Sequence, residues 1–445
     1  MGQGADRLTA HAPLSRRNKL DHGPGWIKTR DRLTALAYHR LVALTVLTVD
    51  DRRGAPLPEM PRAEVAALYV HVPFCFHKCH YCDFYSITRQ TDERMSRFVD
   101  RTLAELDLWL ASPSITLKPR TVFFGGGTPS LLPLRHMERL LGSLRRRLDF
   151  SQLEEWTVEI NPATADLDYC RMLRSHGVDR LSFGAQSFNE RELKMLERHH
   201  HPDDVVESVQ LARAAGFRRL NLDLIYAIPT QTLDSWHDSL SAAIALRTEH
   251  LSCYGLTYEP NTPMTVRKRL GAFVPADDDL EIAMLRQARQ RLSSAGYQAY
   301  EISNHARPRE ECLHNLVYWS GGNYVGLGPS AASHVAGVRF RNKPHLGEWE
   351  VAVDNGVLPI TDAERLTPRQ RADELAMLRL RCTTGVDFDD FADRCGLDAR
   401  QLYGRALREL ADLRLVEIDE RGFRLTDAGL PVADSVIARL VASDH

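Results

Sequence analysis

The sequence lacks any apolar run that approaches the length of a membrane span. Residues 35–47 are mostly apolar, but this stretch is short and is interrupted by His39 and Arg40. It does not stand at the extreme N-terminus, so a secretory signal is not expected. An excess of one charge is also lacking, since 57 basic and 59 acidic residues give a net charge of −2. This balance offers no electrostatic reason to expect a nucleic acid as partner.

Cysteines are few, and most of them stand alone. Of the eight, Cys75, Cys79 and Cys82 lie close together, and the others are Cys170, Cys253, Cys312, Cys382 and Cys395. A disulfide scaffold packs many cysteines into a short chain, whereas here only three of eight cluster in 445 residues, so the sequence excludes one. Free thiols fit a reducing compartment, and we expect a cytoplasmic protein.

The three close cysteines follow a C-x3-C-x2-C spacing, directly after an alternating apolar run that predicts a strand. On a loop, thiolates this close can converge on one metal centre, and they are the usual ligands of iron–sulfur clusters. Three ligands leave one iron of a four-iron cluster open, as in metal sites that perform chemistry. The alternatives are a zinc site, with His77 or His80 as fourth ligand, and a disulfide loop.

From residue 64 onward the pattern alternates between strands and helices. Apolar, β-branched runs predict strands at Ala66–Val72, Thr121–Phe124, Trp156–Ile160, Arg180–Phe183, Leu220–Ile225 and Leu251–Leu256. Helical patterns between them include Glu93–Leu110, Leu134–Leu148, Leu167–His176, Pro202–Ala215 and Leu233–Ala245. Such alternation predicts βαβ units and a parallel sheet in an α/β fold. Six units are too few for a closed eight-stranded barrel, so we predict an open, partial (β/α)6 barrel with ligands at the C-terminal strand ends.

Around the cysteines the sequence resembles a known family. C-x3-C-x2-C after a first strand is similar to the signature of the radical SAM enzymes. Tyr69-x-His-x-Pro-Phe-Cys75, with Cys82-Asp-Phe84, resembles one branch: the oxygen-independent coproporphyrinogen oxidases (HemN) and the HemW haem chaperones. The resemblance implies a 4Fe-4S cluster on the three cysteines, with S-adenosylmethionine (SAM) at its open iron. It also implies that an electron from the reduced cluster cleaves SAM to a 5′-deoxyadenosyl radical.

The same resemblance assigns a SAM pocket. Glycines in Phe124-Gly-Gly-Gly-Thr-Pro-Ser130 let the backbone approach a ligand closely, although a tight turn explains them equally well on the residues alone. The pocket residues that the resemblance implies are Tyr69, Tyr81, Gly126, Gly127, Thr128, Glu159, Gln186, Arg198 and Asp223. His199-His-His201 is not expected to bind a metal, because adjacent side chains point in different directions.

Two features favour the HemW branch over HemN. The coproporphyrinogen oxidases carry a further cysteine two residues after the third ligand, where this chain has Phe84. His314-Asn-x-x-Tyr318-Trp319 resembles the HemW hallmark, in which the histidine is implicated in haem binding. A neutral imidazole is a common haem ligand, and the two aromatic side chains could form flat walls. On the residues alone, a simpler interpretation is that His314 hydrogen-bonds within a turn while Tyr318 and Trp319 fill the core.

The composition changes near residue 360. Thr367-Pro368 predicts the start of a helix that ends near Leu380. Further helices at 387–395 and 398–413, a hairpin at 415–426 and a last helix through Val441 suggest a winged-helix-like module. Such modules often bind DNA, but the balanced charge favours packing against the barrel or a partner protein.

The predicted domains are an extension at 1–61, the radical SAM barrel at 62–300, a barrel extension at 301–360 and a C-terminal domain at 361–445. The extension has little periodicity beyond a helix expected near 30–47, and its composition predicts disorder. Met60 lies shortly before Tyr69, where members of the resembled family commonly begin, so it is a candidate start.

The hypothesis from the sequence is a HemW-like haem chaperone. The resemblance implies that it binds a 4Fe-4S cluster, SAM and haem, and delivers haem to proteins such as membrane respiratory enzymes. It also implies an electron donor, and a homodimer is one state the protein could adopt. The first rival is the HemN reaction, the anaerobic oxidative decarboxylation of coproporphyrinogen III to protoporphyrinogen IX. A radical SAM methyltransferase is the second rival, but no motif supports it.

Overall fold

Six parallel strands joined by helices form the centre of the structure. The computed structural model describes residues 61–442. The six strands are β1 (Ala63–Val72), β2 (Ile115–Gly126), β3 (Glu155–Ile160), β4 (Arg180–Gln186), β5 (Arg219–Tyr226) and β6 (His250–Gly255). The helices between them are α2 (Asp92–Leu110), α3 (Leu134–Arg147), α4 (Leu167–Ser175), α5 (Glu190–Met195), α6 (Pro202–Ala214) and α7 (Leu233–Ala245). The six predicted strands and five predicted helices are confirmed, although β2 begins earlier than expected.

The sheet continues past these six strands on both sides. Its order is β12-β11-β10-β9-β1-β2-β3-β4-β5-β6-β8-β7, so the sheet is open, with β12 and β7 as its edges. The added strands are β7 (Gln298–Ala299), β8 (Asn304–Ala306), β9 (Tyr324–Leu327), β10 (Ala332–Val335), β11 (Val338–Asn342) and β12 (Ile360–Arg365). The helices of this part are α8 (Pro263–Arg269), α9 (Asp278–Ser294), α10 (Leu313–Trp319) and α11 (Leu346–Asp354). The sequence pattern did not predict these added strands, because such short runs carry no clear period.

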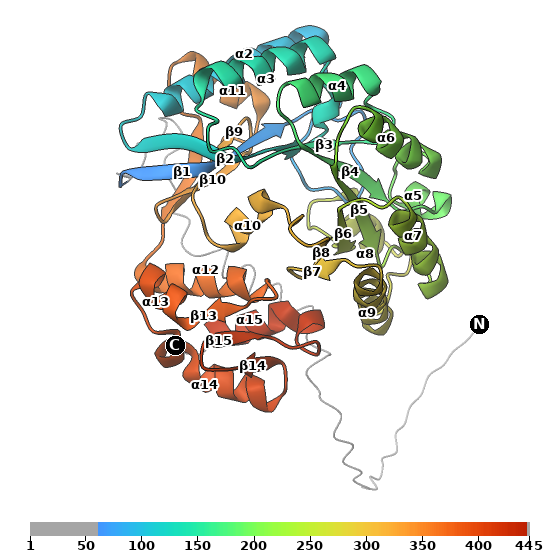
Figure 1. The fold of residues 1–445 in the computed structure, drawn as a ribbon, viewed down its shortest axis with the longest axis vertical. Helices are drawn as coiled ribbons and strands as arrows, with labels where there is room; N and C mark the ends of the chain where they lie inside the picture. The colour runs from blue at the N-terminus through green and yellow to red at the C-terminus, as the bar shows by residue number, and fades with distance from the viewer. Residues whose placement is uncertain (1–60, 443–445) are drawn as a thin grey trace, which may run out of the picture. The chain divides into compact units, whose positions relative to one another are not determined.

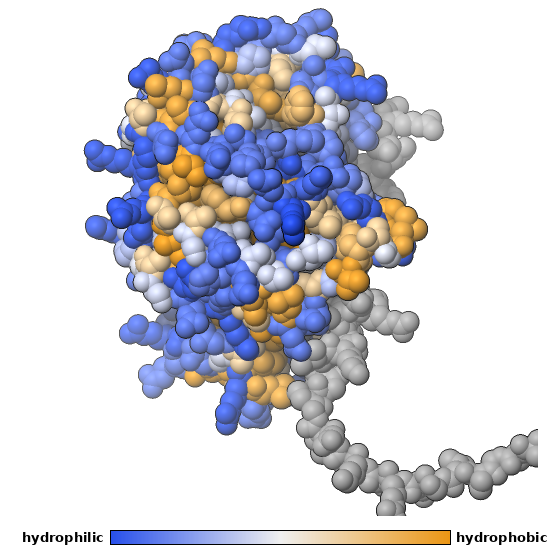
Figure 2. Space-filling view, turned by 90° about the vertical axis from the view of Figure 1, so that its right-hand side faces the viewer, coloured by the Kyte–Doolittle hydropathy of each residue, from blue (hydrophilic) through white to orange (hydrophobic). Residues whose placement is uncertain are grey.

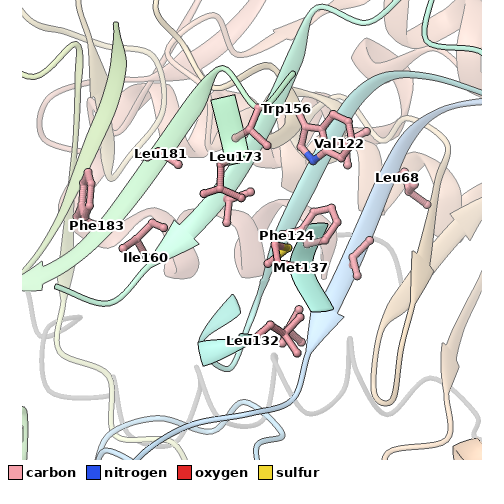
Figure 3. Packing of buried hydrophobic residues seen from close by; sticks show 14 of the residues in the cluster. Leu68, Val122, Phe124, Leu132, Met137, Trp156, Ile160, Leu173, Leu181 and Phe183 are labelled. Carbon is pink, nitrogen blue, oxygen red and sulfur yellow. The ribbon is translucent and has the colours of Figure 1, made fainter. Parts of the chain in front are cut away.

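Alternation along each strand separates an apolar outer face from a polar inner face. Figure 1 shows α2, α3, α4, α6 and α7 around the outside of the curved sheet, with α10 on its inner side. Figure 3 shows the outward strand side chains packed against Leu132, Met137 and Leu173 of the helical layer; they include Val122, Phe124, Trp156, Ile160, Leu181 and Phe183. Successive residues of a strand point to opposite faces, so the intervening positions face inward.

The C-terminal part has its own buried core. It consists of α12 (Pro368–Leu380), β13 (Val386–Asp387), α13 (Phe388–Cys395), α14 (Ala399–Asp412), β14 (Val416–Ile418), β15 (Gly422–Leu425) and α15 (Ala433–Val441). Thr367 caps α12 in a capping box with Gln370, and Pro368 occupies the first turn. The predicted helices and hairpin are therefore confirmed. One apolar cluster ends at Ile360 and the next begins at Ala372, while the predicted domain limits themselves stay predictions.

Some expectations fall outside this part of the chain. The helix near 30–47 and the role of Met60 lie outside the described residues. Among residues 61–442, no helix is both long and apolar enough to cross a bilayer. On the face drawn in Figure 2, hydrophilic residues surround scattered hydrophobic ones.

Candidate functional site

A cavity of about 540 Å³ lies against the polar inner face of the strands. Inward residues of the strands that line it are Tyr69, His71, Phe123, Thr157, Glu159, Arg180, Ser182, Asn221, Asp223, His250 and Ser252. Of the residues assigned to cofactor binding from the sequence, Tyr69, Gly126, Glu159, Asp223 and Tyr318 line this cavity. The sequence analysis missed most of the polar inner wall. These wall residues could have been predicted from the sequence, because polar residues alternate with apolar ones along β4, β5 and β6.

The three cysteines of the metal prediction lie on the loop after β1, and side chains from elsewhere in the chain donate hydrogen bonds to two of them. Thr128 Oγ1 lies 3.7 Å from the sulfur of Cys75, and Arg198 Nη1 lies 3.6 Å from the sulfur of Cys79. Burial raises the pKa of the Cys75 thiol and raises that of Cys82 to about 11, and the neighbouring cysteines add to both shifts. These sulfurs are therefore poor free thiolates, and a positively charged metal centre would stabilise them.

The two histidines considered as fourth ligands of a zinc site lie near a carboxylate. Among the described residues, no three His, Cys, Asp or Glu side chains form a group that could hold a single metal ion. His77 Nε2 and His80 Nδ1 instead lie 4.0 and 3.8 Å from carboxylate oxygens of Glu197. An iron–sulfur cluster binds each thiolate through a different iron, so its ligands need not meet at one point.

Gly126 and Gly127 bring the β2 end close to β1. Gly126 has a φ of +101°, and a Cβ there would lie 2.4 Å from the ring of His71. A Cβ on Gly127 would lie 2.7 Å from the carbonyl oxygens of Val72 and Phe74. The Gly127 N–H donates to Val72 O and the Thr128 N–H to Phe74 O, at 2.8 and 2.7 Å. The glycines therefore hold Thr128 next to the cysteine loop.

Two buried carboxylates share the cavity wall. Burial and the neighbouring Asp223 raise the pKa of Glu159 to about 8, although the Gly126 N–H lowers it. Burial also raises the pKa of Asp223, against hydrogen bonds from Ser182 and Asn221 at 3.0 and 2.9 Å. Two carboxylates with raised pKa values favour a ligand that brings positive charge.

The remaining residues assigned to SAM do not line the cavity, and two of them, Thr128 and Arg198, contact cysteine sulfurs. Arg198 Nη2 donates to Asn161 Oδ1 and to Gly184 O, at 2.5 and 2.8 Å, but no hydrogen-bond partner is found for its buried Nε among the described residues. Burial raises the pKa of Tyr81, and the positive charge of the nearby Arg198 opposes this shift. Gln186 has a φ of +63°, a strained conformation at the end of β4.

His314 is completely buried, and both of its ring nitrogens have partners. Nδ1 lies 2.9 Å from Thr121 Oγ1, and Nε2 lies 2.8 Å from the Tyr318 hydroxyl. Its ring stacks on Phe123 with 5.3 Å between centroids. Burial lowers the pKa of His314 to about 4, although Glu155 opposes the shift, so the imidazole is neutral at pH 7. Trp319 does not line the cavity, and the Arg381 guanidinium lies 5.7 Å from its ring centroid.

A buried ion-pair network that the sequence did not indicate fixes α10. Glu155 is fully buried, and its Oε2 accepts from Arg180 Nε and Arg219 Nη2, both at 3.1 Å. Its two oxygens also accept from the backbone N–H groups of Leu313 and His314, at 3.1 and 3.0 Å. Burial alone would raise the pKa of Glu155, but the two arginines and the N–H groups hold it below its usual value. The motif helix is therefore bound to the N-terminal ends of β3, β4 and β5.

Comparison with known proteins identifies the family. The chain matches the model described as "Radical SAM superfamily" over residues 69–243 and "HemN C-terminal domain" over residues 366–432. The protein named heme chaperone HemW of Lactococcus lactis subsp. lactis is 31% identical over 84% of this chain and 97% of its own length. The chain belongs to the HemW family. The family member of Mycobacterium tuberculosis is 34% identical over 87% of this chain and 96% of its own, and HemW of Escherichia coli is 40% identical over 60% and 70%.

The fold of this HemW family member also matches a solved structure. Coproporphyrinogen III oxidase (HemN) of Escherichia coli superimposes with a TM-score of 0.73, covering 86% of this chain and 91% of that chain at 24% identity. At this identity the likeness shows the radical SAM fold alone. The fold class predicted from the sequence is thus confirmed.

For a HemW family member, the radical SAM match implies a 4Fe-4S cluster and SAM. The residues present fit both groups. Cys75, Cys79 and Cys82 could hold the cluster, since all three lie on the loop after β1 and the raised pKa values of Cys75 and Cys82 favour a metal centre that stabilises their thiolates. The buried carboxylates could face the positive charges of SAM, and the unpartnered Nε of Arg198 leaves a donor for its carboxylate.

Proposed function

We propose that this protein is a haem chaperone that binds a 4Fe-4S cluster, SAM and haem and delivers haem to haem proteins. The observation that carries the proposal is the match to proteins named heme chaperone HemW along 96–97% of their own length. A shared activity requires the whole scaffold, and this scaffold is shared nearly from end to end.

Cys75, Cys79 and Cys82 hold the cluster in this proposal. When bound, the cluster and SAM together supply one-electron chemistry. Thr128 and Arg198 donate hydrogen bonds to the thiolates, restrain the loop and stabilise added negative charge. The carboxylates of Glu159 and Asp223 orient a cationic ligand in the cavity whose wall they share.

Haem binding by His314, Tyr318 and Trp319 remains part of the proposal. Iron ligation through Nε2 of His314 requires that nitrogen to release the Tyr318 hydroxyl. Its neutral state at pH 7 suits it to bind a metal. The haem-accepting proteins are expected to include respiratory enzymes, and an electron donor is needed to reduce the cluster.

A haem titration of anaerobically purified, cluster-reconstituted protein tests the proposal. We expect saturable one-to-one binding in absorbance spectra, weakened by His314→Ala and not by His237→Ala, which changes an exposed histidine of α7. Equal binding by both variants would keep the haem function and remove His314 as ligand. Absence of saturable binding in the unaltered protein would refute the function.

A further inference from the structure

The cavity has a surface opening with a distinct composition. Most of the residues that line the cavity are buried or half-buried, but Asp83, Phe84, Tyr254, Ala332 and Arg341 are exposed. We call these five residues the mouth. They come from the loop after Cys82, from β6, and from β10 and β11, so the mouth joins the cysteine loop to the added strands.

Aromatic rings form the apolar part of the mouth. Phe84 is 60% exposed and Tyr254 is 38% exposed. Tyr85, next to Phe84 in the chain, lines the cavity as a half-buried residue, and it is fixed because its hydroxyl accepts from the Leu346 N–H at 2.8 Å. Flat aromatic side chains with one polar edge suit a flat, partly apolar ligand.

Arg341 supplies a cation at the mouth that can change partners. Its guanidinium is paired with Asp362 at 2.9 Å, and both side chains are about half exposed. Exposed pairs of this kind contribute little stability, so a ligand carboxylate can replace Asp362. Across the strand pair, Arg341 is opposite Ala332, whose small side chain leaves room beside the guanidinium.

Charge also sets the orientation of a ligand. Asp83 repels a carboxylate on its side of the mouth, and inside the cavity the buried Glu159 and Asp223 offer a carboxylate no positive charge. An anionic group therefore stays at the surface near Arg341 while an apolar ring covers Phe84. The cavity of about 540 Å³ must also accommodate SAM, so a large ring fits at the mouth and not inside.

We propose that the mouth docks the face of a planar macrocycle that carries carboxylates, namely a porphyrin such as haem, through Phe84 and Arg341. The proposal rests on the proposed haem function and adds a docking surface to the predicted haem ligand on the HNxxYW helix. Only Tyr318 of that helix's three predicted haem residues reaches the cavity. Docking through the ring and its carboxylates requires no iron.

The test titrates the cluster-reconstituted full chain with haem, iron-free protoporphyrin IX and protoporphyrin IX dimethyl ester. Loss of one charge-assisted hydrogen bond is expected to weaken haem and protoporphyrin binding about tenfold in Arg341→Gln. The dimethyl ester is expected to bind the unaltered protein as weakly as haem binds Arg341→Gln, and to be insensitive to that substitution. Phe84→Ser is expected to weaken all three ligands.

Matched controls separate docking from general damage. Phe76→Ser changes the other exposed phenylalanine of the cysteine loop, which does not line the cavity, and Lys343→Gln removes one positive charge just after β11. Haem binding that is indifferent to Arg341→Gln and Phe84→Ser would overturn the mouth site and leave the haem function standing. If neither haem nor protoporphyrin binds the unaltered protein, the function and the site fail together.

Discussion

Glu155 offers the clearest test of how the HNxxYW helix is held. Glu155→Gln keeps the size of the side chain and removes its charge. Among the described residues, Glu155 is the one carboxylate that pairs with Arg180, which is 1% exposed, and Arg180 Nη1 already has no hydrogen-bond partner there, so the substitution leaves this arginine without a counter-charge. Removing one member of a buried ion pair costs about 3–5 kcal/mol, because the remaining charge stays buried without compensation. We expect the free energy of unfolding to fall by about this amount.

The assay is urea unfolding of cluster-free protein, with hydrogen exchange of the α10 backbone amides as a local readout. Glu154→Gln is the matched control, since Glu154 is 43% exposed and pairs with Arg120, itself 58% exposed. An exposed pair is worth less than about 1 kcal/mol. If Glu155→Gln destabilises the protein no more than Glu154→Gln does, and the α10 amides stay protected, the reasoning about this network is wrong.

Three further predictions concern the cofactor site and stability. Arg198→Gln removes a positive charge and a donor next to Cys79, so the cluster becomes harder to reduce, about tenfold in the reduction equilibrium or ~59 mV in an electron paramagnetic resonance titration. Gly126→Ala places a Cβ 2.4 Å from the His71 ring and should abolish measurable SAM binding in calorimetry. Burial raises the pKa of Glu105 to about 8, so its contribution to stability is complete below its unfolded pKa and is lost as pH rises towards 8. Glu105→Gln should make the melting temperature depend less on pH over this range.

The controls for these three predictions lie at exposed or open positions. Arg191→Gln removes an exposed arginine of α5, and Gly142→Ala in α3 has no atom closer than 3.5 Å to the new Cβ. A reduction potential unchanged in Arg198→Gln, or equal SAM affinity in the two alanine variants, would contradict the site geometry. An equally steep pH dependence in Glu105→Gln would remove Glu105 as its source.

Local pattern predicted the strands and their connecting helices because these elements are long and their periods are clear. The cysteine loop and the glycine turn could also be predicted, since both lie within a few residues of a strand end. The partners of Glu155 could not, because they lie 25, 64 and 159 residues further along the chain. The simpler interpretation from the residues, a hydrogen-bonded His314, agrees with the structure. No local signal says which end of a barrel a seven-residue helix will occupy, so the contacts of His314 with Thr121 and Phe123 appeared only in the structure.

The claim that this protein carries haem, and does not oxidise a porphyrinogen, is tested most directly in one preparation. Reduced, cluster-reconstituted protein would be loaded with haem and mixed with an apo haem protein, and in parallel supplied with coproporphyrinogen III and SAM. The account predicts haem transfer to the acceptor, seen as its holoprotein spectrum, and no porphyrin product. Porphyrin formation without haem transfer would contradict the chaperone and establish the oxidase.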